Sequence, residues 1–296
     1  MKTAQLSYEQ CEEIAEQSRS NFLAALDSLP DRERLAMTAV YAFMRCADDL
    51  ADADAPKATR RDRLDDFRRD FLKTLKHGIT PVFTNFRNHV NGVLPAVTDT
   101  IYHYRIPQEY FCNVLDGVTS DLDKDAYETA EELERYGYQV ASSVGLICLH
   151  IWGVDPLLIT PESDSPVKEA AIACGMALQW TNILRDVRED ADMDRVYLPL
   201  EGIPREEMLD AILRRDKKFL SPVLRKNLER TRKYYGKASF LMGAIPKKYR
   251  RTLWLLVTVY FKLYQKIRRS PEVVLRKRIR LDLFDRLEIY LRSLWV

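Results

Sequence analysis

The sequence predicts an all-helical protein. Apolar residues recur at helical spacing along most of the 296-residue chain, and no convincing run alternates between apolar and polar residues as a half-buried strand would. Only 10 glycines and 13 prolines interrupt the chain, so long stretches can stay helical. No low-complexity linker, composition shift or internal repeat divides the sequence. We therefore expect a single helical domain over residues 1–296.

Prolines, glycines and short polar segments mark where the expected helices end. Such breaks fall at Pro30, His77-Gly78, Pro107, Gly153–Pro156, Pro199, Pro246 and Ser270-Pro271. The helices expected between them cover residues 8–27, 32–54, 58–77, 82–103, 107–120, 128–153, 164–194, 205–214, 217–242, 247–269 and 281–294. Within the sixth, the small residues of Val140–Gly145 stand on consecutive turns, and Gly145 could kink the helix. Tight helix packing and contact with a flat ligand both fit this run.

The composition excludes several classes of protein. Hydrophobic residues make up 46% and charged residues 30%, as in soluble globular proteins. The net charge of +2 is too small to indicate a nucleic-acid partner. The first residues are polar and acidic, unlike a signal peptide, and the most apolar stretches, 140–153 and 253–261, are too polar or too short to span a bilayer. We expect a cytoplasmic protein without a transmembrane helix, which can still lie on a membrane.

Cysteine and histidine carry no recognisable site. The five cysteines form no CxxC pair, so we interpret them as buried thiols in a reducing compartment, not as disulfides or zinc ligands. The four histidines are dispersed, none lies in a sequence suggestive of a catalytic triad, and we interpret His150 as a core residue. No glycine-rich loop marks a nucleotide site.

The first of two acidic clusters lies in Tyr41–Asp52 (YAFMRCADDLAD). On a helix, Arg45, Asp48 and Asp52 fall at i, i+3 and i+7 and so share one face. The segment before them is apolar. The acidic stripe therefore continues a buried helix, although an ordinary solvated face remains the competing interpretation of this cluster taken alone.

The second cluster lies in QWTNILRDVRED and also continues an apolar stretch. Four polar side chains fall at i, i+3, i+7 and i+11, and thus on one face. They are Gln179, Asn182, Asp186 and Asp190. This face presents only amides and carboxylates, and a solvated face is again the competing interpretation of the cluster alone.

Together the two stripes predict a metal site. Carboxylates one turn apart repel each other and lose hydration when buried, so they need cations. Carboxylate and amide oxygens without His or Cys suit a hard ion such as Mg²⁺, which readily shares its shell with phosphate. If the two helices face each other, ions between them could hold a diphosphate from both sides and stabilise the charge that develops as it leaves. Two ordinary charged faces explain the pair of stripes poorly.

Both segments resemble the signatures of the squalene/phytoene synthase family. The likeness covers Tyr41–Asp52 and Gln179–Pro199 (QWTNILRDVREDADMDRVYLP), and it extends to Ser20–Phe22 and Tyr136–Gly145 (YGYQVASSVG). It therefore runs over most of the chain, and it is strongest to bacterial presqualene diphosphate and squalene synthases. The resemblance implies a helical bundle around a deep central cavity, of the isoprenoid synthase type, and a Mg²⁺-dependent prenyltransferase.

By matching position, the resemblance also implies roles for single residues. The implied catalytic residues are Asp48, Asp52, Asp186, Asp190 and Tyr136. The implied metal ligands are Asp48, Asp52, Asn182, Asp186 and Asp190. The implied substrate contacts are Arg45, Gln179, Asn182, Arg185, Phe22, Leu26, Thr38, Tyr41, Val140, Tyr260 and Arg278. Arginine forks suit phosphate and aromatic faces suit a carbocation, whereas we interpret Trp180 mainly as a core residue.

Family members join two allylic prenyl diphosphates head to head through a cyclopropylcarbinyl diphosphate. The first hypothesis for this chain is the condensation of two farnesyl diphosphates to presqualene diphosphate or a squalene-type C30 product. One alternative is a phytoene synthase that uses two geranylgeranyl diphosphates, because the modest size of Leu26 and Thr38 leaves room for the longer chain. Another is a non-catalytic assembly or binding protein, against which the complete acidic stripes argue.

The resemblance names cofactors and partners as well. Mg²⁺ is the expected ion, Mn²⁺ is a substitute for it, and NADPH is an optional reductant that no motif decides. Prenyl diphosphates and downstream enzymes of an isoprenoid pathway, hopanoid or carotenoid, are the expected partners, and no nucleic acid. The basic residues at Arg268-Arg269 and Arg276–Arg280 form either a solvated surface or a contact for anionic lipid headgroups, so peripheral membrane contact is also expected.

Overall fold

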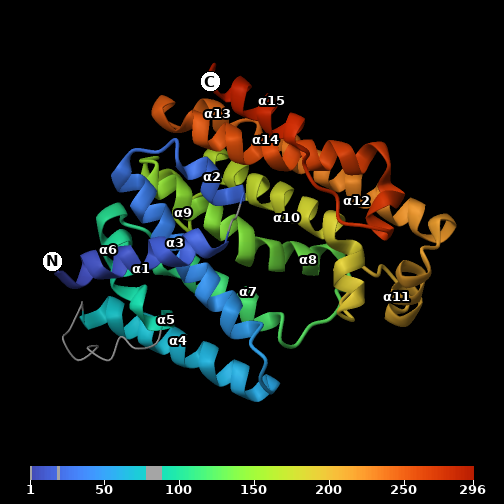
Figure 1. The fold of residues 1–296 in the computed structure, drawn as a ribbon, viewed down its shortest axis with the longest axis horizontal. Coiled ribbons are helices and arrows are strands. Elements are labelled where there is room, and N and C mark those ends of the chain that lie inside the picture. The colour runs from blue at the N-terminus through green and yellow to red at the C-terminus, as the bar shows by residue number, and fades with distance from the viewer. Residues whose placement is uncertain (1, 19–20, 78–88) are drawn as a thin grey trace.

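Helices make up nearly all regular structure of this computed structural model, which describes residues 2–18, 21–77 and 89–296 (Figure 1). The first half contains α1 (Lys2–Ser18), α2 (Asn21–Leu26), α3 (Asp31–Ala51), α4 (Lys57–His77), α5 (His89–Gly92), α6 (Leu94–Tyr104) and α7 (Gln108–Ser120). The middle contains α8 (Ala130–Gly137), η2 (Tyr138–Ser142), α9 (Ser143–Ile151), η3 (Pro156–Leu158) and α10 (Pro166–Asp192). The last part contains α11 (Arg205–Arg214), α12 (Lys217–Ala238), α13 (Leu241–Ala244), α14 (Lys247–Arg269), η4 (Pro271–Leu275) and α15 (Leu283–Ser293).

The all-helical prediction is confirmed, and several boundaries differ from the predicted ones. Within the described part of the chain, the only strand-like pairing is one bridge between Ala126 and Val196. The helix expected over 8–27 overlaps α1 and α2, and the residues between these two lie outside the described ones. The helix expected over 82–103 lies partly outside the described residues, and its remainder is α5 and α6, because Pro95 starts a new helix at its first turn.

The long helix α10 lies at the centre of the bundle. It packs against α9, α12 and α14, and Figure 1 shows it running through the middle of the molecule. Ser165 caps its first turn by accepting a hydrogen bond from the Lys168 backbone N–H at 3.1 Å. Its buried face is rich in alanine and glycine, which lets neighbouring backbones approach. The position of α10 explains how its acidic end can face several other helices at once.

The helix expected over 128–153 is interrupted by a π-helical segment, η2, between α8 and α9. The irregularity precedes Gly145, at which the sequence suggested a kink. A Cβ on Gly175 of α10 would lie 2.5 Å from the Ser142 Cα, and one on Gly117 of α7 would lie 2.4 Å from the Val140 Cγ1. The backbone of η2 therefore fits closely between α7 and α10, as one of the two interpretations of this small-residue run requires.

The described helices contain no segment long and apolar enough to cross a bilayer.

Replacing Gly175 by alanine should destabilise the fold, because the new methyl group would meet the Ser142 backbone and not a flexible side chain. We expect a loss of about 2 kcal/mol in the free energy of unfolding, as for overpacking of a core. Gly236→Ala on α12 is the matched control, since nothing lies within 4 Å of its Cβ position. Alanine should stabilise that helix by about 0.5–1 kcal/mol. Denaturant unfolding measures both, and equal effects of the two variants would contradict the close approach of η2 to α10.

Candidate active site

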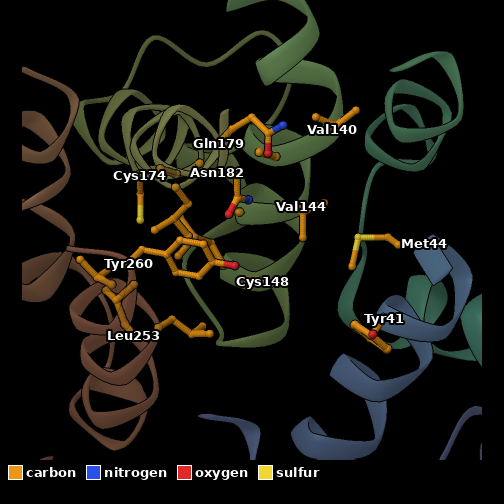
Figure 2. A pocket seen from close by; sticks show the side chains of 18 of the residues that line it. Tyr41, Met44, Val140, Val144, Cys148, Cys174, Gln179, Asn182, Leu253 and Tyr260 are labelled. Carbon is orange, nitrogen blue, oxygen red and sulfur yellow. The ribbon is translucent and has the colours of Figure 1, made fainter. Parts of the chain in front are cut away.

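A cavity of about 350 Å³ lies between α3, α9, α10 and α14 (Figure 2). Much of its wall is apolar and comes from Met44, Val144, Leu149, Trp152, Leu241, Leu253 and Leu256. Its polar lining consists of Arg45, Asp48, Gln179, Asn182 and Tyr260. In Figure 2, Tyr41 and Met44 of α3 face Gln179 and Asn182 of α10 across the open space. The cavity thus joins an apolar chamber to a polar end.

A second hollow of about 160 Å³ adjoins this polar end. Its lining consists of Tyr136, Gln179, Asn182, Ile183, Asp186, Asp190 and Tyr197. The two hollows share Gln179 and Asn182, so those amides lie where the spaces meet. The acidic stripe of α10 therefore faces the region that Asp48 of α3 lines from the other side. The structure thus places Asp48 of one predicted stripe and Asp186 and Asp190 of the other on adjoining hollows, although the two stripes lie far apart along the chain.

The carboxylates of α3 lie in a strongly acidic environment. The Asp48 side chain is exposed where it lines the cavity, and protein surrounds it on its other sides. Loss of hydration raises the pKa of Asp48 to about 7, and repulsion from Asp52 is the second cause. Asp52 is the C-cap of α3, and its backbone N–H donates to the Asp48 carbonyl at 2.8 Å. Asp52 is not among the described residues that line either hollow. Its charge raises the pKa of Asp48.

A third carboxylate, Asp121 at the end of α7, completes this acidic group. Burial raises its pKa to about 6, although the Tyr136 and Tyr197 hydroxyls donate hydrogen bonds to it at 2.8 and 3.1 Å. The charge of Arg195 also favours its ionised form. No sequence pattern singled out Asp121, Tyr197 or Arg195. Arg195 and Tyr197 lie within the Gln179–Pro199 signature, but no periodic pattern connects that segment with the end of α7.

The carboxylates of α10 are partly neutralised by arginine. The Arg185 guanidinium donates to both Asp186 oxygens at 2.7 and 2.5 Å. Arg278, which lies far along the chain, contacts Asp186 at 3.1 Å and Glu189 at 2.9 Å. Asp190 has a raised pKa of about 7, first because of burial and then because of the Asp186 charge. Two arginines therefore gather at the acidic end of α10.

The donor set fits a hard cation. The Asn182 Oδ1 is buried without a hydrogen-bond partner in the described part of the chain, so it is an acceptor that still lacks a positive group. The surrounding groups offer only oxygen ligands, as Mg²⁺ prefers. Across residues 2–18, 21–77 and 89–296, no three His, Cys, Asp or Glu side chains converge closely enough to hold an ion alone. An ion here would need to share its shell with substrate oxygens, and Mg²⁺ ligation stays a prediction.

Most of the other predicted substrate contacts line the main cavity or the adjoining hollow. Tyr41, Arg45, Val140 and Tyr260 line the main cavity, and Arg45 also pairs with Asp49 at 2.6 Å. Tyr260 interacts with the Asn182 amide. The ring of Tyr136 lies 5.4 Å from that of Tyr127 and 5.8 Å from that of Tyr197.

Two of the predicted substrate contacts, Leu26 and Thr38, do not line the cavity in the described structure. Leu26 is buried in the core, and neither it nor Thr38 is among the described residues of the cavity wall. The Thr38 hydroxyl instead donates to the Arg34 carbonyl at 2.9 Å. The side chain of Phe22 lies outside the described residues. Their roles stay predictions.

Residues interpreted as structural behave accordingly. Trp180 and His150 are buried in the core, and burial lowers the pKa of His150 to about 4. The five cysteines are free thiols. Two of them, Cys148 and Cys174, line the main cavity, which the sequence did not suggest.

An all-helical bundle with a polar, acidic entrance to an apolar cavity defines the isoprenoid synthase class of fold. Comparison with known proteins agrees: the sequence pattern of squalene/phytoene synthases matches residues 15–285. A phytoene synthase of Arthrospira platensis is 31% identical over 280 residues, which cover 92% of this chain and 87% of the relative. A crystal structure of a dehydrosqualene synthase has a TM-score of 0.81 and 25% identity, covering 99% of this chain and 96% of that one.

A squalene synthase from Alicyclobacillus acidocaldarius shares the fold, with a TM-score of 0.76 and 23% identity over 89% of this chain and 94% of that one. The chain belongs to the squalene/phytoene synthase family, and it is a prenyltransferase-type enzyme.

Asp190→Asn should change how the stability of the metal-free protein depends on pH. The pKa of Asp190 is raised from 3.8 to about 7, so the folded state binds the proton more tightly than the unfolded state. The protonated Asp190 carboxyl therefore favours the folded state at low pH, and this contribution to the free energy of unfolding is lost as pH rises from about 4 to about 7. The variant should melt about 2–4 °C above the wild type near pH 8, and the difference should shrink near pH 5. Melting curves in chelator measure this, and a difference that is constant with pH would refute the assignment.

Proposed function

We propose that the protein condenses two prenyl diphosphates head to head, with the diphosphates at the polar end of the cavity and the prenyl chains in its apolar chamber. The observation that carries this proposal is the junction at Gln179 and Asn182, where the apolar cavity meets carboxylates from α3 and α10. Membership of the squalene/phytoene synthase family supports the same reaction.

Asp48, Asp52, Asn182, Asp186 and Asp190 would hold Mg²⁺. When bound, the ion would neutralise diphosphate charge and make the diphosphate a better leaving group. Arg185 and Arg278 pair with Asp186, and they would donate to phosphate oxygens once a diphosphate binds. Arg45 at the cavity wall would add a third positive charge on the α3 side.

The protein's own groups would protect the reacting carbons. The apolar walls from Val144 and Leu253 would exclude water from an allylic cation, and the ring faces of Tyr41 and Tyr136 would attract its charge. The Tyr136 hydroxyl is committed to Asp121 by a 2.8 Å hydrogen bond, which fixes the ring position. These residues orient and shield the substrate rather than forming bonds to it.

Farnesyl diphosphate is the first candidate substrate, with presqualene diphosphate or a squalene-type C30 lipid as product. The structural similarity to a dehydrosqualene synthase, which covers 99% of this chain at 25% identity, favours it. Geranylgeranyl diphosphate is the second candidate, because phytoene synthases from Arthrospira platensis and Synechocystis are 31% and 28% identical to this chain. A non-catalytic role is disfavoured, since each carboxylate of both stripes is present.

Incubation of the protein with Mg²⁺ and either substrate, with and without NADPH, should separate these candidates. Mass spectrometry of the extracted lipids should detect a C30 product or presqualene diphosphate from farnesyl diphosphate. A C40 product from geranylgeranyl diphosphate alone would favour the second candidate. Chelator should abolish turnover, and Mn²⁺ should restore part of it. No product from either substrate would refute the proposed reaction.

Asp48→Asn and Asp186→Asn should each lower kcat by at least about 10²-fold, because each removes charge that would hold the ion and the leaving group. Asp192→Asn is the matched control on α10. Asp192 pairs with Arg188 at 2.8 Å and lies outside both hollows in the described structure. It should retain near-normal turnover. Steady-state kinetics with circular dichroism tests this, and near-normal activity of either cavity variant would refute the metal-site assignment.

A further inference from the structure

The helix α15 turns its apolar side chains away from the bundle. Its buried side chains, Asp285, Ile289 and Ser293, follow one another at intervals of four residues and thus form one face. The opposite face, with the residues that directly follow the helix, is apolar and exposed; we call it the α15 apolar face. It consists of Leu283, Phe284, Leu287, Tyr290, Leu291, Leu294 and Trp295. Phe284 is 85% exposed and Trp295 92%.

A surface helix usually packs its apolar face on the core and turns its polar face to solvent. In α15 polar contacts hold the helix on the bundle, and its apolar face is exposed. Lys266 of α14 pairs with the buried Asp285, and Lys262 contacts Glu288 at 2.7 Å. The helix start is fixed by a capping box in which Asp282 and Asp285 each accept a backbone N–H of the other. The outward direction of the apolar face is therefore set by specific ion pairs and not by fraying of a loose end.

Exposed basic residues lie on α15 and on the segment that precedes it. Arg276, Lys277 and Arg280 are exposed on the segment that leads into the helix, and Arg286 is exposed on the helix itself. The nearby acidic groups are compensated within the fold, since Lys266 contacts Asp282 at 3.0 Å and Lys262 contacts Glu288. The rim of the face therefore has a net positive character. Its two most exposed aromatic residues are Phe284 and Trp295.

We propose that the α15 apolar face docks on the surface of an anionic lipid bilayer. An exposed apolar stripe bordered by Arg and Lys, with Tyr and Trp on it, is the pattern of a helix that lies in the plane of a membrane. A second copy of the chain fits less well, because two faces with the same positive rim would repel each other. The basic residues at 276–280, noted in the sequence, would contribute charge at the edge of this surface, and the apolar contact with the bilayer would come from α15.

The position of α15 would bring a bound membrane close to the cavity. Figure 1 shows α15 at the outer edge of the molecule beside α14, against which it packs. The other side of α14 contributes Leu253, Leu256 and Val257 to the cavity. A bilayer on the α15 apolar face would therefore lie one helix away from the chamber proposed for prenyl chains. The binding surface itself is argued from exposure and charge, so it stands or falls independently of the proposed reaction.

Vesicle flotation of the full chain tests the proposal. The protein should float with vesicles of phosphatidylcholine and phosphatidylglycerol, bind vesicles of phosphatidylcholine alone much more weakly, and be released by salt. The double variant Phe284→Glu/Trp295→Glu should lower the partition coefficient at least about tenfold. Arg280→Gln/Arg286→Gln should lower it about tenfold on the anionic vesicles.

Leu157→Glu is the matched control, because Leu157 in η3 is exposed and apolar but lies outside the α15 apolar face. It should bind vesicles like the wild type, and circular dichroism should show that every variant keeps its helices. Trp295→Phe should remove the vesicle-induced blue shift of tryptophan fluorescence, since the other tryptophans are buried or half-buried.

Three results would overturn the proposal. One is a wild type that stays with the soluble fraction, and another is equal loss of binding in Leu157→Glu. The third is a dimer in sedimentation equilibrium that Phe284→Glu/Trp295→Glu dissociates, which would assign the face to a second copy. Turnover of prenyl diphosphates in the same variants is measured separately, so failure of membrane binding is distinguishable from failure of the proposed reaction.

Discussion

The crowding of carboxylates between α3 and α10 is the constraint on which the rest of the structure depends. Asp48, Asp121 and Asp190 have pKa values raised to between about 6 and 7, because the fold holds them partly buried and near like charges. Such a group costs stability unless cations compensate it. The fold supplies part of that compensation through Arg185 and Arg278, and it leaves the Asn182 oxygen without a partner. The proposed Mg²⁺ would supply the positive charge that these carboxylates and the Asn182 oxygen lack.

Close backbone packing makes this arrangement possible. The glycines of α7 and α10 let η2 approach them, so that Val140 and Ala141 of η2 line the cavity opposite α3. A π-helical turn adds a residue to the helix path, which changes the direction of the side chains that follow. Small residues in Val140–Gly145 therefore serve packing and cavity shape at once. The two interpretations of this run are compatible.

The helix α14 links the cavity with the outside of the molecule. One side contributes Leu253 and Tyr260 to the cavity wall, and the other carries the lysines that hold α15. These ion pairs use charge where most surface helices use apolar contact, and the apolar residues of α15 are left facing outward as a result. An enzyme that handles prenyl chains has a use for such a surface, since its substrates and products partition into lipid.

Periodicity alone determined that the chain is helical, and the residue types of the two stripes predicted a site of oxygen ligands with neighbouring arginines. The family followed from the same segments. These are local properties, carried by residues within about three turns of one another on a helix. The direction of α10, the break at η2 and the union of the two stripes depend on which helices pack side by side, and no local pattern records that.

Only the tertiary structure decided the membership of Asp121, Tyr197 and Arg195 in the site, because they come from separate segments that meet through packing. It also showed that Leu26 and Thr38 are buried and are not among the described residues of the cavity wall. The outward direction of α15 was decided the same way. Its sequence shows an amphipathic helix, but ion pairs with Lys262 and Lys266 determine which face turns to solvent. Amphipathic periodicity identifies a face, and only its partners determine where that face points.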